Sequence, residues 1–235
     1  MPGRTVSVIH FSVILPAAGR STRFGGGELK KVYVPLHGQP VWLHSAKRFA
    51  TRPDVRGVVV VISPDDEVYF CEQFADVCDQ LGIQIALGGE TRTDSIANGI
   101  RALNSPGEFI AIHDAARPGI DDAMIDAVFN TAAGSGAAIL ALPVPGTLKR
   151  VSIEGKIVET VPREGVWEAQ TPQVFRRQLI LEAYEKFGNE PATDDASLVE
   201  RLGHPVSVVR GGLKNLKITT KDDLVVAEQL LADVS

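Results

Sequence analysis

Short apolar runs alternate with helix-length segments along most of the chain, and this alternation constrains the fold more than any other feature. Five runs are rich in Val and Ile and continuous in their hydrophobicity, as expected of strands buried on both faces. They cover residues 6–15, 56–63, 83–87, 108–114 and 137–144. Helical patterns lie between them, at 39–51, 65–80, 91–103 and 121–133. The order predicts an α/β fold: a Rossmann-like, mostly parallel sheet with helices on both faces and functional loops at the carboxyl ends of its strands.

The pattern changes after residue 143. Two extended, β-branched pieces flank Glu154-Gly155, which is a hairpin signal, so we expect a protruding β-arm at about 143–164 of the kind that pairs subunits. The stretch "EGVWEAQTPQ" (164–173) lacks a clear period and is expected to be a site-forming loop. Later elements are expected as helices at 176–187, 194–202 and 221–233 and a strand at 205–209. We expect residues 1–235 to form a single domain, since 44% hydrophobic composition at this length suits one large core.

Composition excludes several classes of partner. The net charge is −5, so no overall basic field is available for nucleic acid or an anionic membrane. No run approaches the roughly 18 apolar residues of a membrane span. Arg4, the apolar run to Leu15 and "PAAG" imitate a signal peptide, but His10 and Ser12 interrupt the run and favour a buried strand. Two cysteines without disulfide or zinc spacing are expected to be reduced thiols, and we expect a cytoplasmic protein.

The segment "VILPAAGRSTRFGGGELKK" (13–31) places small residues and cationic side chains directly after the first strand. Small residues let backbone N–H groups approach a phosphate, and cations neutralise its charge, so the segment predicts an anion-binding loop. It is neither a Walker A motif nor a dinucleotide G-x-G-x-x-G. The alternative is that 16–19 only allows a helix to pack closely, with the cations solvated.

A second group of residues, "HDAARP" (113–118), follows the fourth predicted strand. Asp114 would point into the crevice, where one carboxylate plus substrate phosphates can hold Mg²⁺. Arg117 could bind a second phosphate as a planar fork. The alternative makes Asp114 a turn or cap residue paired with Arg117.

With these motifs the chain resembles a known family, the 2-C-methyl-D-erythritol 4-phosphate cytidylyltransferases of non-mevalonate isoprenoid synthesis. The resemblance spans nearly the whole chain and rests on motifs in the family's order. They are "PAAG" with Arg23 and Lys31, "GGETRTDSI" (88–96), "HDAARP", "PVPGTLKR" (143–150), "VPREGVWEAQTPQVF" (161–175), "TDDAS" (193–197) and "NLKIT" (215–219). Each motif alone is weak, and the set is specific.

The resemblance implies a nucleotide-diphospho-sugar transferase type of fold, Mg²⁺ as cofactor, CTP and a polyol phosphate as substrates, and a homodimer. The implied catalytic cations are Arg23, Lys31 and Lys217, with Asp114 as metal ligand. The implied nucleotide-binding residues are Pro16, Ala17, Ala18, Gly19, Gly89, Glu90, Ser95, Asp114 and Ala115. The implied sugar-phosphate residues are Arg117, Thr147, Arg163, Thr171 and Thr193, of which Arg117 and Thr147 approach from the neighbouring subunit. The implied reaction is in-line attack of the 4-phosphate on the α-phosphorus of CTP, with pyrophosphate leaving and no covalent enzyme intermediate.

Several alternatives stay open at this point. Lys30 could replace Lys31, because the proline and glutamine that flank the family's lysine are Lys30 and Val32 here. Thr91 with Asp94, and Thr193 with the acidic residues after it, could serve as helix caps. Other functions to be weighed are a ribitol-5-phosphate cytidylyltransferase, a non-catalytic nucleotide sensor and, more remotely, a nicotinamide dehydrogenase. His113 is expected to support the crevice loop rather than to act as a base.

Overall fold

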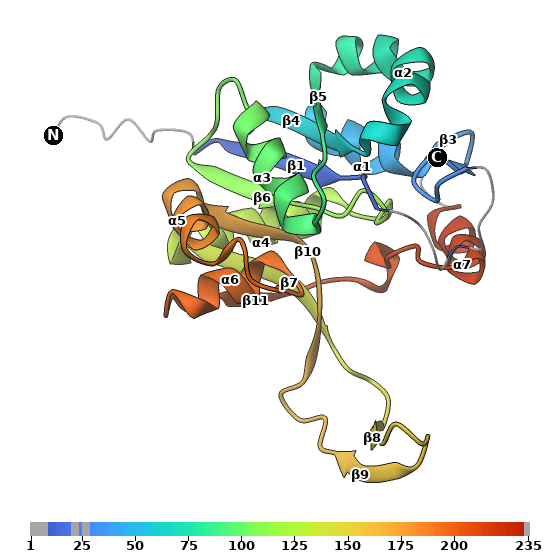
Figure 1. Cartoon of the computed structure of the whole chain (residues 1–235), viewed down its shortest axis with the longest axis vertical. Helices are drawn as coiled ribbons and strands as arrows, with labels where there is room; N and C mark the ends of the chain where they lie inside the picture. The colour runs from blue at the N-terminus through green and yellow to red at the C-terminus, as the bar shows by residue number, and fades with distance from the viewer. Residues whose placement is uncertain (1–8, 20–23, 25–28, 233–235) are drawn as a thin grey trace, which may run out of the picture.

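A seven-stranded sheet forms the centre of the molecule (Figure 1), which is a computed structural model that describes residues 9–19, 24 and 29–232. Its strand order is β11-β7-β10-β6-β1-β4-β5. The strands are β1 (Phe11–Pro16), β4 (Val55–Ile62), β5 (Ile83–Leu87), β6 (Phe109–Ile112), β7 (Ala137–Pro143), β10 (Trp167–Arg176) and β11 (Ser207–Arg210). All run in one direction except β10, which is antiparallel to both of its neighbours. The mostly parallel sheet is therefore confirmed.

Helices cover both faces of this sheet. One face packs against α1 (Val41–Ala50), α2 (Glu67–Leu81) and α4 (Asp122–Ser135). The other packs against α3 (Arg92–Ala102), α5 (Arg177–Phe187) and α6 (Asp195–Arg201). Successive strand residues point to opposite faces, so on β4 Val58 and Val60 enter the first core and Val59 and Val61 the second. A strand buried on both faces needs apolar residues at every position, which is the continuous pattern in the sequence.

A third, smaller core lies near the C-terminal helix. The closing helix α7 (Lys221–Leu231) packs with the short hairpin of β2 (Pro35–Leu36) and β3 (Gln39–Pro40) through Leu36, Ile218 and Ala227. Thr220 caps α7 in a capping box with Asp223. The backbone N–H of Ile218 donates to Ala116 O at 2.8 Å. This bond fixes the 215–219 segment next to the loop that follows β6.

The expected loop at 164–173 is the main error of the sequence-based prediction. Most of it belongs to β10, which lies between β6 and β7. Its second half is buried although Gln170, Thr171 and Gln173 are polar, and hydrogen bonds satisfy these side chains. Polar residues inside a buried strand conceal its period. The strand predicted at 6–15 also differs, since within the described residues it begins at Phe11.

The predicted hairpin arm is present. Strands β8 (Leu148–Val151) and β9 (Ile157–Val161) pair antiparallel, and Gly155 has a φ of 78° in the turn between them. Figure 1 shows the arm standing clear of the sheet on two stems that continue from β7 and β10. Its apolar side chains are therefore not covered by the body of the chain.

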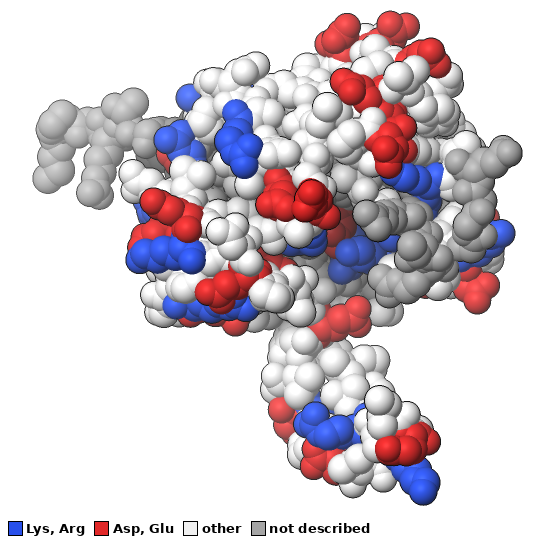
Figure 2. All heavy atoms as spheres, viewed as in Figure 1, with Lys and Arg blue, Asp and Glu red and all other residues white. Residues whose placement is uncertain are grey.

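The surface charge and the hydropathy of the helices bear on the expectations of a mixed surface charge and no membrane span. Figure 2 shows basic and acidic side chains interspersed on the face in view, with acidic ones gathered over α2. Within residues 9–19, 24 and 29–232, no helix is both long enough and apolar enough to span a bilayer.

Candidate active site

A cavity of about 830 Å³ opens at the carboxyl ends of β1, β4, β5 and β6. This is where the strand order reverses around β1, the position at which open α/β sheets bind ligands. Predicted residues that line it are Pro16, Ala17, Ala18, Gly19, Lys31, Gly89, Glu90, Ser95, Asp114 and Lys217. Segments far apart in sequence therefore meet at one site, as predicted. Arg23 lies outside the described residues.

Close backbone packing shapes one wall of the cavity. The turn after β1 is tied to β4 by a hydrogen bond from Ala17 N to Val61 O at 2.7 Å. A Cβ added to Gly88 would lie 2.9 Å from Ala18 Cβ and 2.8 Å from Ser95 Oγ. The wall therefore requires glycine at position 88, and small residues keep backbone groups accessible from the cavity.

The amino end of α3 forms the adjoining wall. Thr91 is the N-cap, and its hydroxyl and the Asp94 carboxylate form a capping box, which confirms capping at this motif. Ser95 Oγ accepts from Gly89 N at 3.1 Å and donates to Thr91 O at 2.9 Å. Capping fixes the turn while leaving the positive end of the α3 dipole at the cavity.

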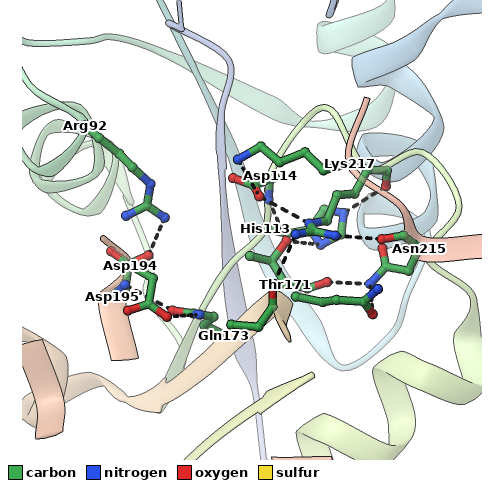
Figure 3. A network of polar contacts seen from close by, with 12 residues as sticks. Arg92, His113, Asp114, Thr171, Gln173, Asp194, Asp195, Asn215 and Lys217 are labelled. Atoms are coloured by element: carbon green, nitrogen blue, oxygen red, sulfur yellow. Dashed lines mark hydrogen bonds and ion pairs between the residues drawn. The ribbon is translucent and has the colours of Figure 1, made fainter. Parts of the chain in front are cut away.

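Figure 3 shows Asp114 and Lys217 pointing toward one another, and both residues line the cavity. Lys217 Nζ lies 3.0 Å from Asp114 Oδ2, and Arg117 Nε donates to the same oxygen at 3.2 Å. Burial alone would raise the pKa of Asp114, but the charges of Lys217, Arg117 and Arg92 outweigh burial and hold that pKa well below its usual range. Asp114 is therefore an ionised carboxylate at neutral pH.

Arg117 is buried within its own chain. It is 6% exposed, and its guanidinium donates to Asp114, to Asn215 O at 2.8 Å and to Ala169 O at 3.4 Å. The expectation that Arg117 serves a neighbouring subunit's site stays a prediction. The expected ion pair between Arg117 and Asp114 is confirmed, and Arg117 also binds the backbone of the Lys217 segment through Asn215 O.

His113 supports this arrangement as a neutral group. Nε2 lies 3.1 Å from Arg117 O, a carbonyl that can only accept, so this nitrogen carries the proton. Nδ1 then accepts from the Thr171 hydroxyl at 3.2 Å, and Thr171 Oγ1 accepts from Asp114 N at 2.9 Å. Complete burial lowers the pKa of His113 to about 4. His113 and Thr171 thus hold the Asp114 backbone in place.

This neutral histidine should make folding stability depend on pH. The unfolded chain binds a proton at His113 below about pH 6.5 and the native chain only near 4, so stability falls as pH decreases through that interval. We expect His113 to account for a loss of about 2 kcal/mol between pH 7 and pH 5. Asp114, whose pKa is lowered, contributes stability that is lost only at more acidic pH. Urea denaturation of wild type and His113→Asn at both pH values measures the free energy of unfolding. An equal loss of this free energy between pH 7 and pH 5 in the two proteins would contradict the prediction.

Both candidate lysines line the cavity. Lys30 Nζ pairs with Asp66 at 2.7 Å, and Tyr33 donates to the same carboxylate oxygen at 3.0 Å. Lys30 is thus committed to a carboxylate beside α2, although it also lines the cavity. The resemblance assigns phosphate binding to Lys31, and that assignment stays a prediction.

The remaining predicted residues lie away from the cavity lining. Ala115 is buried within the loop that carries Asp114, and Thr171 is buried on β10, where its hydroxyl accepts from Asp114 N. Thr147 and Arg163 are exposed on the stems of the arm, where Arg163 donates to Pro145 O. Thr193 is exposed, and it is not the cap of α6, because Asp194 accepts from Ser197 N at 3.1 Å and is the N-cap.

Some residues at the site were not singled out from the sequence. Arg92 lines the cavity and pairs with the fully buried Asp195, although it lies inside the quoted motif 88–96. Asn215, in the motif 215–219, donates to Thr171 O at 2.8 Å and so positions the Lys217 segment. Ser63, Pro64 and Asp65 form the wall after β4 and carry no motif of their own.

Among the described residues no group of three or more His, Cys, Asp or Glu side chains could hold a metal. A metal at this site would need most of its ligands from a bound substrate. Asp114 fits that requirement, since it presents one ionised carboxylate at the cavity and oxygen is the ligand that Mg²⁺ prefers.

A mostly parallel sheet with a small-residue turn, a lysine-bearing cavity and an ionised carboxylate at its switch point is typical of α/β enzymes that bind a nucleotide polyphosphate. A family model, 2-C-methyl-D-erythritol 4-phosphate cytidylyltransferase, matches residues 11–233. The chain belongs to that family.

Individual family members are similar to this chain over nearly its whole length. The chain is 44% identical to the 2-C-methyl-D-erythritol 4-phosphate cytidylyltransferase of Rhodopirellula baltica, over 94% of this chain and 94% of that one. It resembles the crystal structure of the cytidylyltransferase from Thermus thermophilus with a TM-score of 0.76 and 34% identity, covering 95% of this chain and 100% of that one. A 4-diphosphocytidyl-2C-methyl-D-erythritol synthase from Anaerococcus prevotii gives a TM-score of 0.80 at 28% identity, over 95% and 96% of the chains.

Proposed function

We propose that the cavity binds CTP and that Lys31 and Lys217 serve the family's reaction there. That reaction is cytidylyl transfer from CTP to 2-C-methyl-D-erythritol 4-phosphate, which gives 4-diphosphocytidyl-2-C-methyl-D-erythritol and pyrophosphate. The observation that carries the assignment is the Lys217–Asp114 pair at 3.0 Å in the cavity that Lys31 also lines.

The chemistry follows from charge and position. A phosphate monoester oxygen attacks the α-phosphorus in line, and the bond to the β-phosphate oxygen breaks to release pyrophosphate. Ammonium groups already held at the cavity wall stabilise the negative charge that grows on the α-phosphate oxygens. Neutral His113 is buried behind the loop, so it is not placed to act as a base. We assign Arg23 to the same phosphate group from the resemblance alone.

We assign Mg²⁺ to Asp114. Its carboxylate would hold the metal, and among the described residues its ion pairs with Arg117 and Lys217 would keep that carboxylate in place. When bound, Mg²⁺ would neutralise charge on the phosphate oxygens of the nucleotide.

We propose a homodimer in which the arm of one subunit completes the polyol phosphate site of the other. Thr147 and Arg163 lie on this arm, whereas Thr171 lies in the sheet. The arm exposes Val151 at 52%, Ile157 at 65% and Val158 at 63%, an apolar surface that suits a partner rather than water. Thr193, exposed at the start of α6, is assigned to the polyol phosphate.

Arg163→Ala is expected to impair use of the polyol phosphate more than use of CTP. An arginine fork lost from a phosphate site raises the Michaelis constant of that substrate, and we expect a rise of about 10-fold or more. Steady-state kinetics with each substrate varied in turn check this result. A matched control is Arg150→Ala, which removes another exposed arm arginine that pairs with Glu159 within the hairpin. Equal effects of the two variants, or a larger effect on CTP, would count against the assignment.

Mixing two defective variants tests whether the site is shared. Asp114→Asn damages the body of the site and Arg163→Ala the arm, so a mixed dimer has one intact site of two. Random re-association should therefore restore about a quarter of wild-type activity at low polyol phosphate. Activity that stays at the mean of the two pure variants would show that each site draws its arginine from its own chain.

The substrate assignment is tested by pyrophosphate release with Mg²⁺. We expect release from CTP and 2-C-methyl-D-erythritol 4-phosphate, with at least about 10²-fold lower kcat/KM for ATP, GTP, UTP or ribitol 5-phosphate. Faster release with ribitol 5-phosphate would reassign the acceptor, and no release with any pair would indicate a nucleotide sensor.

We propose the cytoplasm as the site of action. Cys71 and Cys78 are both free thiols, as expected in a reducing compartment.

A further inference from the structure

Asp195 is a buried charge outside the cavity that makes its interactions with several different elements. Its side chain is 0% exposed at the first turn of α6. One oxygen accepts from Arg92 of α3 at 2.6 Å, and the other accepts from the Tyr184 hydroxyl of α5 at 2.5 Å. Its backbone N–H donates to Gln173 of β10 at 3.1 Å. A buried carboxylate is tolerated only with such partners.

Gln173 ties Asp195 and the start of α6 to strand β10. Its Oε1 accepts from the N–H groups of Asp195 and Ala196, and its Nε2 donates to Asp194 Oδ2 at 2.8 Å. Figure 3 shows this group beside the Asp114 group, with both attached to the same strand, since Thr171 and Gln173 are two residues apart on β10. The start of α6 is thereby held in register with the loop that carries Asp114.

Arg92 connects Asp195 to the cavity. It is the first residue of α3, it lines the cavity, and its side chain is 35% exposed. One hydrogen bond to Asp195 uses one of five guanidinium N–H donors, so this bond alone does not exhaust the donors of a side chain that lines the cavity. Burial alone would lower the pKa of Arg92, but the charge of Asp195 outweighs burial and raises it, so the cation is retained.

We infer that Asp195 is a positioning residue for nucleotide binding: by fixing the Arg92 guanidinium in the cavity wall, it keeps a cation aimed at the anionic nucleotide. The inference rests on the proposed function, because it takes the cavity to be the CTP site. A purely structural role would affect the amount of folded protein and leave the affinity for CTP unchanged. A positioning role changes that affinity in protein that is fully folded.

The test compares Asp195→Asn, Arg92→Lys and the double variant with wild type. Asp195→Asn keeps the shape and removes the charge, while Arg92→Lys keeps the charge and removes the planar fork. We expect each to raise KM and the calorimetric Kd for CTP about 10-fold, and KM for the polyol phosphate less than about twofold. The double variant should bind CTP no less tightly than the single variant with the larger Kd, because both changes break the same interaction. Tyr184→Phe is the matched control: it removes a hydrogen bond from the same carboxylate, and CTP affinity should stay at the wild-type value.

Several results would overturn this inference. One is an unchanged Kd for CTP in folded Asp195→Asn; another is a pair of single effects that multiply in the double variant. Should Asp195→Asn not fold, Arg92→Lys decides alone, and an unchanged KM for CTP would mean that the orientation of this cation is immaterial. Wild-type protein that neither binds nor consumes CTP would overturn the proposed function and this inference together, whereas active wild type with unaffected variants overturns only the role of Asp195.

Discussion

Lys217→Ala is expected to reduce turnover by about 10²–10³, the loss of about 3–4 kcal/mol of transition-state stabilisation that removal of a preorganised donor causes. Lys217 Nζ is held at 3.0 Å from Asp114, and the segment that carries it is tied down by Asn215 and by the backbone bond from Ile218 to Ala116. The ammonium therefore needs little reorganisation when charge develops on the α-phosphate.

The measurement is steady-state kcat at saturating CTP and 2-C-methyl-D-erythritol 4-phosphate, with Lys214→Ala as control. Lys214 is an exposed lysine three residues earlier on the same segment, and we expect its removal to change kcat by less than about twofold. Lys31→Ala should be impaired to an extent similar to Lys217→Ala, whereas Lys30→Ala should retain more activity, because the resemblance implies Lys31 as the phosphate-binding lysine. Normal turnover in Lys217→Ala would remove this residue from the catalytic group.

Asp114→Asn is expected to lower kcat/KM by about 10² or more for two reasons that act together. It removes the ionised carboxylate that we assign to Mg²⁺, and it leaves Lys217 and Arg117 without their shared counter-charge. The Mg²⁺ concentration for half-maximal activity should rise about tenfold, since a neutral amide oxygen is the poorer ligand.

The control for this variant is Asp65→Asn, an exposed carboxylate on the opposite wall of the cavity. Its Mg²⁺ dependence should match that of wild type. Equal Mg²⁺ requirements in Asp114→Asn and wild type would show that the metal binds elsewhere. Thermal unfolding separates loss of function from loss of fold, since breaking a buried ion pair can cost about 3–5 kcal/mol.

The sequence predicted the fold where one physical requirement dominates. Strands buried on both faces need continuous apolar residues, so β4, β5 and β7 were placed correctly to within a few residues. The capping box at Thr91 and Asp94 was also confirmed, because capping depends on spacing within four residues. Strand β10 could not be predicted in this way. Its buried Gln170, Thr171 and Gln173 are satisfied by partners from distant loops, and those partners cannot be read from local pattern.

The candidate site was predicted in its composition but not in its internal partners. Residues at strand ends gather because parallel strands end at one edge of the sheet, which places Asp114 with 16–19 and 88–92. Which side chain supports which is a matter of three-dimensional packing. The Arg92–Asp195 pair, for example, joins residues 103 positions apart.

The central claim is that Lys31, Lys217 and Asp114 converge on the α-phosphate of CTP. It is tested most directly by a crystal structure of the wild-type protein with CTP and Mg²⁺. The account predicts the triphosphate in the 830 Å³ cavity, with both lysine ammonium groups within hydrogen-bond distance of α- or β-phosphate oxygens and the metal on Asp114. A triphosphate bound outside this cavity, or one that neither lysine contacts, would contradict it.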